Sequence, residues 1–241
     1  MKPAVIIPFR AREGGDPLRK ENLARVVEHW SGYDCEVLVV DDGRSGDEQF
    51  NRSAAYNRGA MRGRTTATAA DMLIFAESDL LVSYAQIDRA IAMAADSPGM
   101  VVPFSWFMAI SEDDSARVRA HQAEPEDCEM EPVRGHRDSI GAVNVLSRQT
   151  LELIGGGYDE AFEGAWYDDD AMKIAFDVAA GPTRFVEGSG YHLYHLSGGH
   201  GEHLSRADRA ATARNRLRLK MYQRARTREQ IVSLAQAWAE G

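Results

Sequence analysis

The sequence contains little cysteine. Cys35 and Cys128 are the two cysteines in 241 residues, and they form no CxxC pair. Two cysteines are too few for a scaffold held together by several disulfides. The pattern favours two reduced, structural thiols, and a single disulfide between them is the alternative that the sequence leaves open.

Long apolar runs are also absent. No window approaches the ~18 consecutive apolar residues of a transmembrane helix, so we expect no transmembrane segment. The apolar part of the first ten residues, MKPAVIIPFR, is too short for a signal peptide, and no small-residue cleavage site follows it. These absences predict a cytoplasmic protein.

Basic residues are in the minority. Lys and Arg number 28 against 37 Asp and Glu, which gives a formal net charge of -9. This balance argues against nonspecific nucleic-acid binding by the whole surface, and no nucleic-acid partner is expected. The phosphate-binding patterns GxGxxG and GxxxxGK[ST] are missing as well. A nucleotide bound here would need a metal ion and arginines to neutralise its phosphates.

Strand-like and helix-like segments alternate along the first half of the chain. Short apolar runs predict strands within 3–9, 35–43, 71–79 and 99–110, and amphipathic patterns predict helices over 17–30, 51–61 and 84–97. With 44% hydrophobic residues the chain can bury a proper core. The alternation predicts an α/β fold with a mostly parallel central sheet and helices on both faces.

The second half is less regular. Residues 111–139 are acidic and polar, and they predict a long excursion or a mobile segment. A strand followed by a helix is expected over 139–156, a glycine-rich loop and a helix over 155–176, and one or two strands within 183–203. One helix is expected from Ser205 almost to the end. It is basic between Arg206 and Arg228, which fits either a solvated face or a docking surface for an acidic acceptor, a partner or a membrane.

Charged residues follow three successive predicted strands. In an open parallel sheet, ligands bind at the carboxyl ends of the strands. These ends carry Pro8, Phe9, Arg10 and Arg12, then Asp41 and Asp42, then Glu77, Ser78 and Asp79. Because residues i and i+2 of a strand point the same way, Glu77 and Asp79 are expected to converge on one ligand, with a cation as the obvious candidate.

Four histidines lie within a short stretch near residue 200. His192 and His195 are three residues apart, and His200 and His203 follow in a glycine-rich loop. Carboxylate and imidazole ligands suit Mn²⁺, and Mg²⁺ accepts the carboxylates. Asp79 with one or two of these histidines and two phosphate oxygens would complete a near-octahedral site.

Three aspartates follow a pair of aromatic residues, in the order Trp166, Tyr167, Asp168, Asp169, Asp170. One interpretation is an acidic helix N-terminus, which the helix dipole favours. The other is a general base beside a flat aromatic face on which a sugar can stack.

Four blocks of the sequence are similar to a known family in order and rough spacing: AVIIPFRAR, FNRSAAYNRGA, LIFAESDLLVS and GAWYDDDAM. Together they resemble the β-1,4-galactosyltransferase-like GT-A glycosyltransferases, and VLVVDDGR resembles the wider family 2 transferases. The resemblance covers about residues 4–200. It implies the GT-A fold and a metal-dependent, inverting transfer of a sugar from a UDP-sugar to an acceptor hydroxyl.

The resemblance also implies residue roles. The implied donor-binding residues are Pro8, Phe9, Arg10, Arg12, Asp41, Asp42, Phe50, Asn51, Arg52, Glu77, Ser78 and Asp79. The implied metal ligands are Asp79, His192 and His195. Asp168 or Asp169 takes the place of the catalytic base, and Trp166, Tyr167 and Asp170 lie in the substrate-binding stretch. Two departures are visible: Glu77 stands where the family has aspartate, and Trp166 and Tyr167 stand where it has glycines.

The resemblance divides the chain into a GT-A domain over 1–204 and a basic helical extension over 205–241. Within the domain, 1–100 is the donor nucleotide half and 101–204 the acceptor and metal half. The acceptor could be a glycan, a protein, a lipid or a small molecule, and the donor sugar and oligomeric state are open. Two other functions are compatible with the sequence: a metal-dependent hydrolase built on His192, His195, His200 and His203, and a non-catalytic sugar-binding module.

Overall fold

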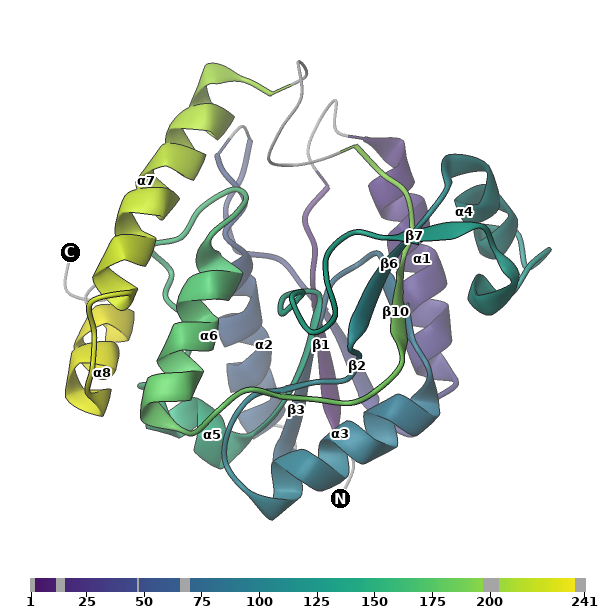
Figure 1. Ribbon diagram of the computed structural model, residues 1–241. Coiled ribbons are helices and arrows are strands. Elements are labelled where there is room, and N and C mark those ends of the chain that lie inside the picture. The colour runs from purple at the N-terminus through teal and green to yellow at the C-terminus, as the bar shows by residue number, and fades with distance from the viewer. Residues whose placement is uncertain (1–2, 12–15, 47, 66–69, 197–203, 237–241) are drawn as a thin grey trace.

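A computed structural model describes residues 3–11, 16–46, 48–65, 70–196 and 204–236. A six-stranded sheet lies at its centre (Figure 1). The strand order in this sheet is β2-β1-β3-β8-β5-β9. The strands are β1 (Ala4–Pro8), β2 (Glu36–Val40), β3 (Met72–Ala76), β5 (Val101–Val102), β8 (Val143–Ser147) and β9 (Arg184–Phe185). The predicted α/β fold is thereby confirmed.

The central sheet is parallel except at β8. β1 pairs in parallel with β2 and β3, and β5 pairs in parallel with β9. β8 runs antiparallel to both of its neighbours, β3 and β5. All five residues of β1 are buried, as expected for a strand covered on both faces.

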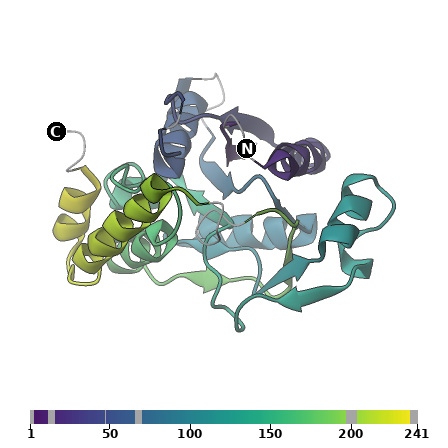
Figure 2. The same ribbon diagram turned by 90° about the horizontal axis from the view of Figure 1, so that it is seen from above.

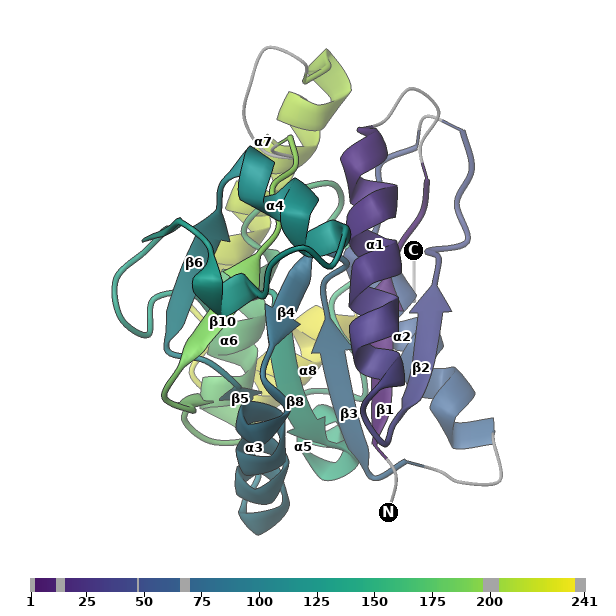
Figure 3. The same ribbon diagram turned by 90° about the vertical axis from the view of Figure 1, so that its right-hand side faces the viewer.

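Helices cover both faces of the sheet (Figure 3). α1 (Pro17–Ser31) and α3 (Tyr84–Asp96) lie on one face, and α2 (Arg52–Thr65), α5 (Arg148–Leu153) and α6 (Asp168–Ala179) lie on the other. α2 approaches β1 closely at Gly59, where an added Cβ would lie 2.3 Å from Cγ2 of Ile6. A side chain at this position would therefore push the helix away from the sheet.

A second, four-stranded sheet has the order β4-β10-β6-β7. Its strands are β4 (Leu80–Val82), β6 (Trp106–Ile110), β7 (Met130–Pro132) and β10 (Ser189–His192). The single strand expected within 99–110 is therefore wrong, because the chain leaves β5 and enters β6 in the other sheet. Pro103 lies at the break, and since it has no N–H it cannot continue a strand ladder.

The segment 111–139 is more ordered than its composition predicted. It contains α4 (Glu112–Arg119), a 3₁₀ turn η1 (Pro125–Asp127) and β7. Ser111 caps α4 by accepting from the amide of Asp114, and three acids occupy its first turn. The acidity that suggested a mobile segment thus belongs in part to a capped helix start.

Two helices, not the one expected, follow Ser205: α7 (Arg206–Tyr222) and α8 (Arg228–Gln236). Viewed from above, both lie at one side of the molecule (Figure 2), and both pack on α6. Buried Asp159 accepts from Nε of Arg218 at 2.7 Å and from the hydroxyl of Tyr222 at 2.9 Å, which ties α7 to the loop before α6. Within the described ranges, no helix has the length and apolar character needed to span a membrane.

Candidate active site

A cleft of about 670 Å³ opens where β1 and β3 end and the second sheet begins. This volume lies within the usual range for small-molecule sites. Most of the predicted site residues line it: Pro8, Phe9, Arg10, Arg52, Glu77, Ser78, Asp79, Trp166, Tyr167, Asp168, Asp169, Asp170, His192 and His195.

Asp79, His192 and His195 form a compact group in this cleft. One ligand atom from each lies within 4.8 Å of the others. Nε2 of His195 is 2.9 Å from Oδ2 of Asp79, and Nε2 of His192 is 3.8 Å from Oδ1. Backbone pairing sets this arrangement, because β10 pairs with β4 and the amide of Leu193 donates to the carbonyl of Asp79.

The polar atoms of this group fit a cation. Oδ1 of Asp79 is buried and has no hydrogen-bond partner among the described residues. Nδ1 of His195 is 2.8 Å from the carbonyl of Leu196 and must donate to it, so neutral His195 presents a lone pair at Nε2. That lone pair faces a carboxylate oxygen, which is favourable only with a proton or a metal ion between them.

The electrostatics of the group favour an ionised carboxylate. Burial opposes ionisation of Asp79, but the hydrogen bond from His195 and the charges of both histidines hold its pKa at about 2. Burial lowers the pKa of His192. Burial also acts to lower the pKa of His195, but its contact with Asp79 outweighs this and raises that pKa.

The backbone that carries His195 is fixed by polar side chains of two helices. Asn22 of α1, which is fully buried, lies 3.5 Å from the carbonyl of Leu193 and donates to that of Tyr194 at 3.2 Å. Ser115 of α4 accepts from the amide of Tyr194 at 2.9 Å. Asp16, the N-cap of α1, accepts from the amide of Leu196 at 2.7 Å.

Arg52, at the start of α2, binds three carboxylates. Its guanidinium donates to Oδ2 of Asp168 at 2.6 and 2.9 Å, to Oδ1 of Asp169 at 2.5 Å, and to Glu77. Burial raises the pKa of Glu77 to about 7 even though Arg52 opposes the shift. Burial likewise raises the pKa of Asp169 against the opposing charge of Arg52. Desolvation disfavours the Arg52 cation, but these carboxylates outweigh it and raise its pKa well above the ordinary value.

Glu77 and Asp79 do not share a strand face, so that prediction is wrong. β3 ends at Ala76 and β4 begins at Leu80, and the two acids lie in the turn between them. Glu77 therefore turns to Arg52, while Asp79 turns to the histidines.

Trp166 and Tyr167 adopt left-handed backbone conformations, with φ of 76° and 75°. A non-glycine residue pays of order 1–3 kcal/mol for such a conformation. Asn215 of α7 supports the strained loop by donating to the carbonyls of Ala165 and Trp166 at 3.3 and 3.1 Å. Trp166 is 42% exposed and lines the cleft beside the three aspartates.

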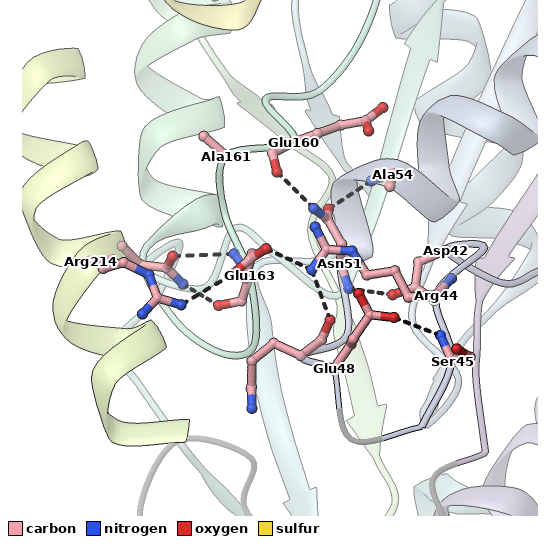
Figure 4. Close-up of polar contacts among 12 residues, drawn as sticks. Asp42, Arg44, Ser45, Glu48, Asn51, Ala54, Glu160, Ala161, Glu163 and Arg214 are labelled. Carbon is pink, nitrogen blue, oxygen red and sulfur yellow. Dashed lines mark hydrogen bonds and ion pairs between the residues drawn. The ribbon is translucent and has the colours of Figure 1, made fainter. Parts of the chain in front are cut away.

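Three predicted donor residues, Asp41, Asp42 and Asn51, are not among the residues that line the cleft. Buried Asp42 accepts from the amide of Asn51 at 2.8 Å (Figure 4). It also pairs with Nε of Arg10 at 3.1 Å. Asn51 caps α2 by accepting from Ala54 and donates to the carbonyl of Glu160. Exposed Asp41 lies 3.6 Å from Arg58. Asp42 and Asn51 thus lie outside the cleft, where Asp42 contacts Arg10 of the cleft lining.

Three predicted site residues are not described by the structure, and three residues of the cleft were not predicted from the sequence. Arg12, His200 and His203 lie outside the described residues. Arg19, Arg134 and Gln49 line the cleft, although no motif singled them out. Arg19 belongs to the first turns of α1, where its sequence context is that of any solvated helix face.

No protein-family model matches the chain, and no curated protein does. Solved structures do match. β-1,4-galactosyltransferase 7 from Drosophila, as a mutant in complex with manganese, UDP-Gal and xylobiose, has a TM-score of 0.53 and 15% identity over 87% of this chain and 79% of that chain. GalNAc-T7 with UDP, GalNAc and Mn²⁺ has a TM-score of 0.52 and 14% identity over 92% of this chain.

The chain has the GT-A fold. The likeness to these glycosyltransferases, which the sequence blocks predicted, is confirmed at the level of the fold. The chain spans 50% of the length of GalNAc-T7 and 64% of a second Drosophila β-1,4-galactosyltransferase 7 structure, a catalytic domain in complex with xylobiose.

Proposed function

We propose that this GT-A protein is a metal-dependent, inverting glycosyltransferase that moves a sugar from a UDP-sugar to an acceptor hydroxyl. One observation carries the proposal. The Asp79, His192 and His195 group and the carboxylates of Asp168 and Asp169 line the same cleft. Arg52 links the two parts, because it binds Glu77 next to the first and both aspartates of the second.

Asp79, His192 and His195 would hold the divalent cation, Mn²⁺ or Mg²⁺. When bound, the cation would neutralise the diphosphate of the leaving nucleotide. The buried, unpartnered Oδ1 of Asp79 and the lone pair of His195 are suitable ligand atoms. Pro8, Phe9, Arg10 and Arg52 would form the donor side of the cleft together with Ser78 and Phe50.

Asp169 is the better candidate for the general base. Its side chain is 38% exposed, whereas that of Asp168 is 10% exposed and is held by two nitrogens of Arg52. Asp168 would therefore orient Arg52, and Asp169 would accept the proton of the acceptor hydroxyl. The acceptor oxygen forms its bond to the anomeric carbon as the bond to the diphosphate breaks on the opposite side, so the configuration inverts.

Trp166, Tyr167 and Asp170 would form the acceptor side. The exposed indole of Trp166 offers an apolar face for a sugar ring, and Asp170 can accept from its hydroxyls. We further propose that 1–100 serves as the donor half, 101–204 as the acceptor and metal half, and 205–241 as a basic helical extension. Two helices of this extension, α7 and α8, pack on α6.

Calorimetric titration of UDP tests the donor site. We expect binding in the presence of Mn²⁺ that is lost in EDTA. Asp79→Asn should abolish this metal-dependent binding, while Asp88→Asn, an exposed aspartate outside the cleft lining, should leave it unchanged. Equal UDP affinity in Mn²⁺ and EDTA would refute the metal role. No binding of UDP, GDP, CMP or dTDP would refute the nucleotide-sugar donor.

A further inference from the structure

The outward face of α7 carries a stripe of basic residues. The helix has 17 residues, and its buried side is formed by Ala211, Asn215, Leu219 and Tyr222. The 3.6-residue period places five exposed basic residues away from that side: Arg206, Arg209, Arg216, Lys220 and Arg224, the last lying just past the helix end. Figures 1 and 2 show α7 at the outer edge of the molecule.

The stripe is not neutralised by nearby acids. None of the five residues forms an ion pair with another described residue. By contrast, Arg214 and Arg218, which flank the buried side of the helix, pair with Glu163 and Asp159. The one acid of the helix, Asp208, bonds Gln49 near the cleft. A concentrated positive stripe thus lies on a protein whose net charge is -9.

Two large apolar side chains adjoin the stripe. Leu217 is 64% exposed and Met221 is 46% exposed, and their four-residue spacing places them together along one edge of the basic face. Exposed apolar residues beside arginines and lysines are typical of a helix that lies in the plane of a membrane interface.

We propose that α7 docks this protein on an anionic lipid bilayer. The basic stripe would meet the headgroups, and Leu217 and Met221 would enter the boundary between headgroups and acyl chains. A nucleic acid would also attract the stripe, but it offers no apolar phase for the two adjacent side chains of Leu217 and Met221. The length of the helix, about 25 Å, gives a contact line suited to a flat surface.

Co-sedimentation with lipid vesicles tests the proposal without any nucleotide, metal or acceptor, so its outcome is independent of the transferase proposal. We expect binding to phosphatidylcholine vesicles that contain phosphatidylglycerol, weak binding to pure phosphatidylcholine, and loss of binding as salt is raised. R216Q/R224Q should weaken binding to anionic vesicles roughly thirtyfold.

Two further variants separate docking from general charge effects. K20Q/R89Q removes the same charge from exposed positions on α1 and α3 and should leave vesicle binding unchanged. L217S/M221S keeps the charge and should still weaken binding. Because all of these side chains are exposed, circular dichroism should show the same fold for each variant.

The proposal is overturned if anionic vesicles do not bind at low salt, or if K20Q/R89Q weakens binding as much as R216Q/R224Q. An oligonucleotide that binds through Arg216 and Arg224 when vesicles do not would assign the face to nucleic acid instead.

Discussion

At the scale of single residues, Arg52 decides how the carboxylates of the cleft behave. It is 16% exposed and binds Glu77, Asp168 and Asp169 at once. Three acids can lie close together in this partly buried place because the cation lies between them. The family resemblance predicted that Arg52 binds the nucleotide. In the structure Arg52 also forms ion pairs with these three carboxylates.

The pH dependence of transfer should report Asp169. A general base acts in its ionised form, and burial raises the pKa of Asp169 above the 3.8 of an ordinary aspartate. The turnover rate should therefore rise with pH through a midpoint above that value. Asp169→Asn should lower the turnover rate about 10²–10⁴-fold while sparing UDP binding. A pH-rate profile of the purified enzyme measures the midpoint.

Arg52 variants provide the control for this profile. Arg52→Gln removes the cation that opposes the shift, so the midpoint should move to higher pH. Arg52→Lys keeps the charge and should move it less. An unchanged midpoint in Arg52→Gln would place the base elsewhere.

At the scale of elements, α1 and α4 hold the strand end that carries the proposed metal ligands. Asn22→Ala removes the bonds to the carbonyls of Leu193 and Tyr194, so His195 loses its fixed position. We expect the affinity for Mn²⁺ to fall about 10–100-fold, as for other residues that orient metal ligands.

Electron paramagnetic resonance of free Mn²⁺ measures this affinity. Thr150→Val serves as a control, because Thr150 is also fully buried and hydrogen-bonded but belongs to α5, outside the cleft lining. It should lower stability and leave Mn²⁺ affinity intact. Equal effects of the two variants on Mn²⁺ affinity would contradict a positioning role for Asn22.

The contact of α2 with β1 depends on Gly59. Alanine favours a helix more than glycine by about 1 kcal/mol, yet Gly59→Ala should destabilise the protein by about 1–3 kcal/mol because its Cβ meets Ile6. Urea denaturation measures the change. Combining it with Ile6→Ala should cost less than the sum of the two single changes, and strict additivity would argue against the contact.

At the scale of the whole molecule, the C-terminal helices belong to the packed body. Arg218 and Tyr222 both donate to the buried carboxylate of Asp159, and Arg218→Leu removes the charged one of these two donors. We therefore expect the free energy of unfolding to fall by about 3 kcal/mol. The urea transition should stay single and shift as a whole. A separate early transition would show that α7 and α8 unfold as an independent unit.

The local features of this protein follow from its amino-acid sequence alone. Apolar runs of strand length located β1, β2 and β3, and helical periodicity located α1, α2 and α3, because burial on a regular element leaves its period in the sequence. The sequence blocks also predicted a GT-A glycosyltransferase, and the fold is confirmed.

Which residues from distant parts of the chain become neighbours depends on the tertiary fold. The proximity of Asp79 to His192 and His195 depends on the pairing of β10 with β4, which joins residues over a hundred positions apart. The turn that separates Glu77 from Asp79, the support from Asn22 and the place of Arg19 in the cleft depend likewise on packing between distant elements. Periodicity records whether a side chain is buried, but it does not record its neighbours, and the chemistry of a site depends on the neighbours.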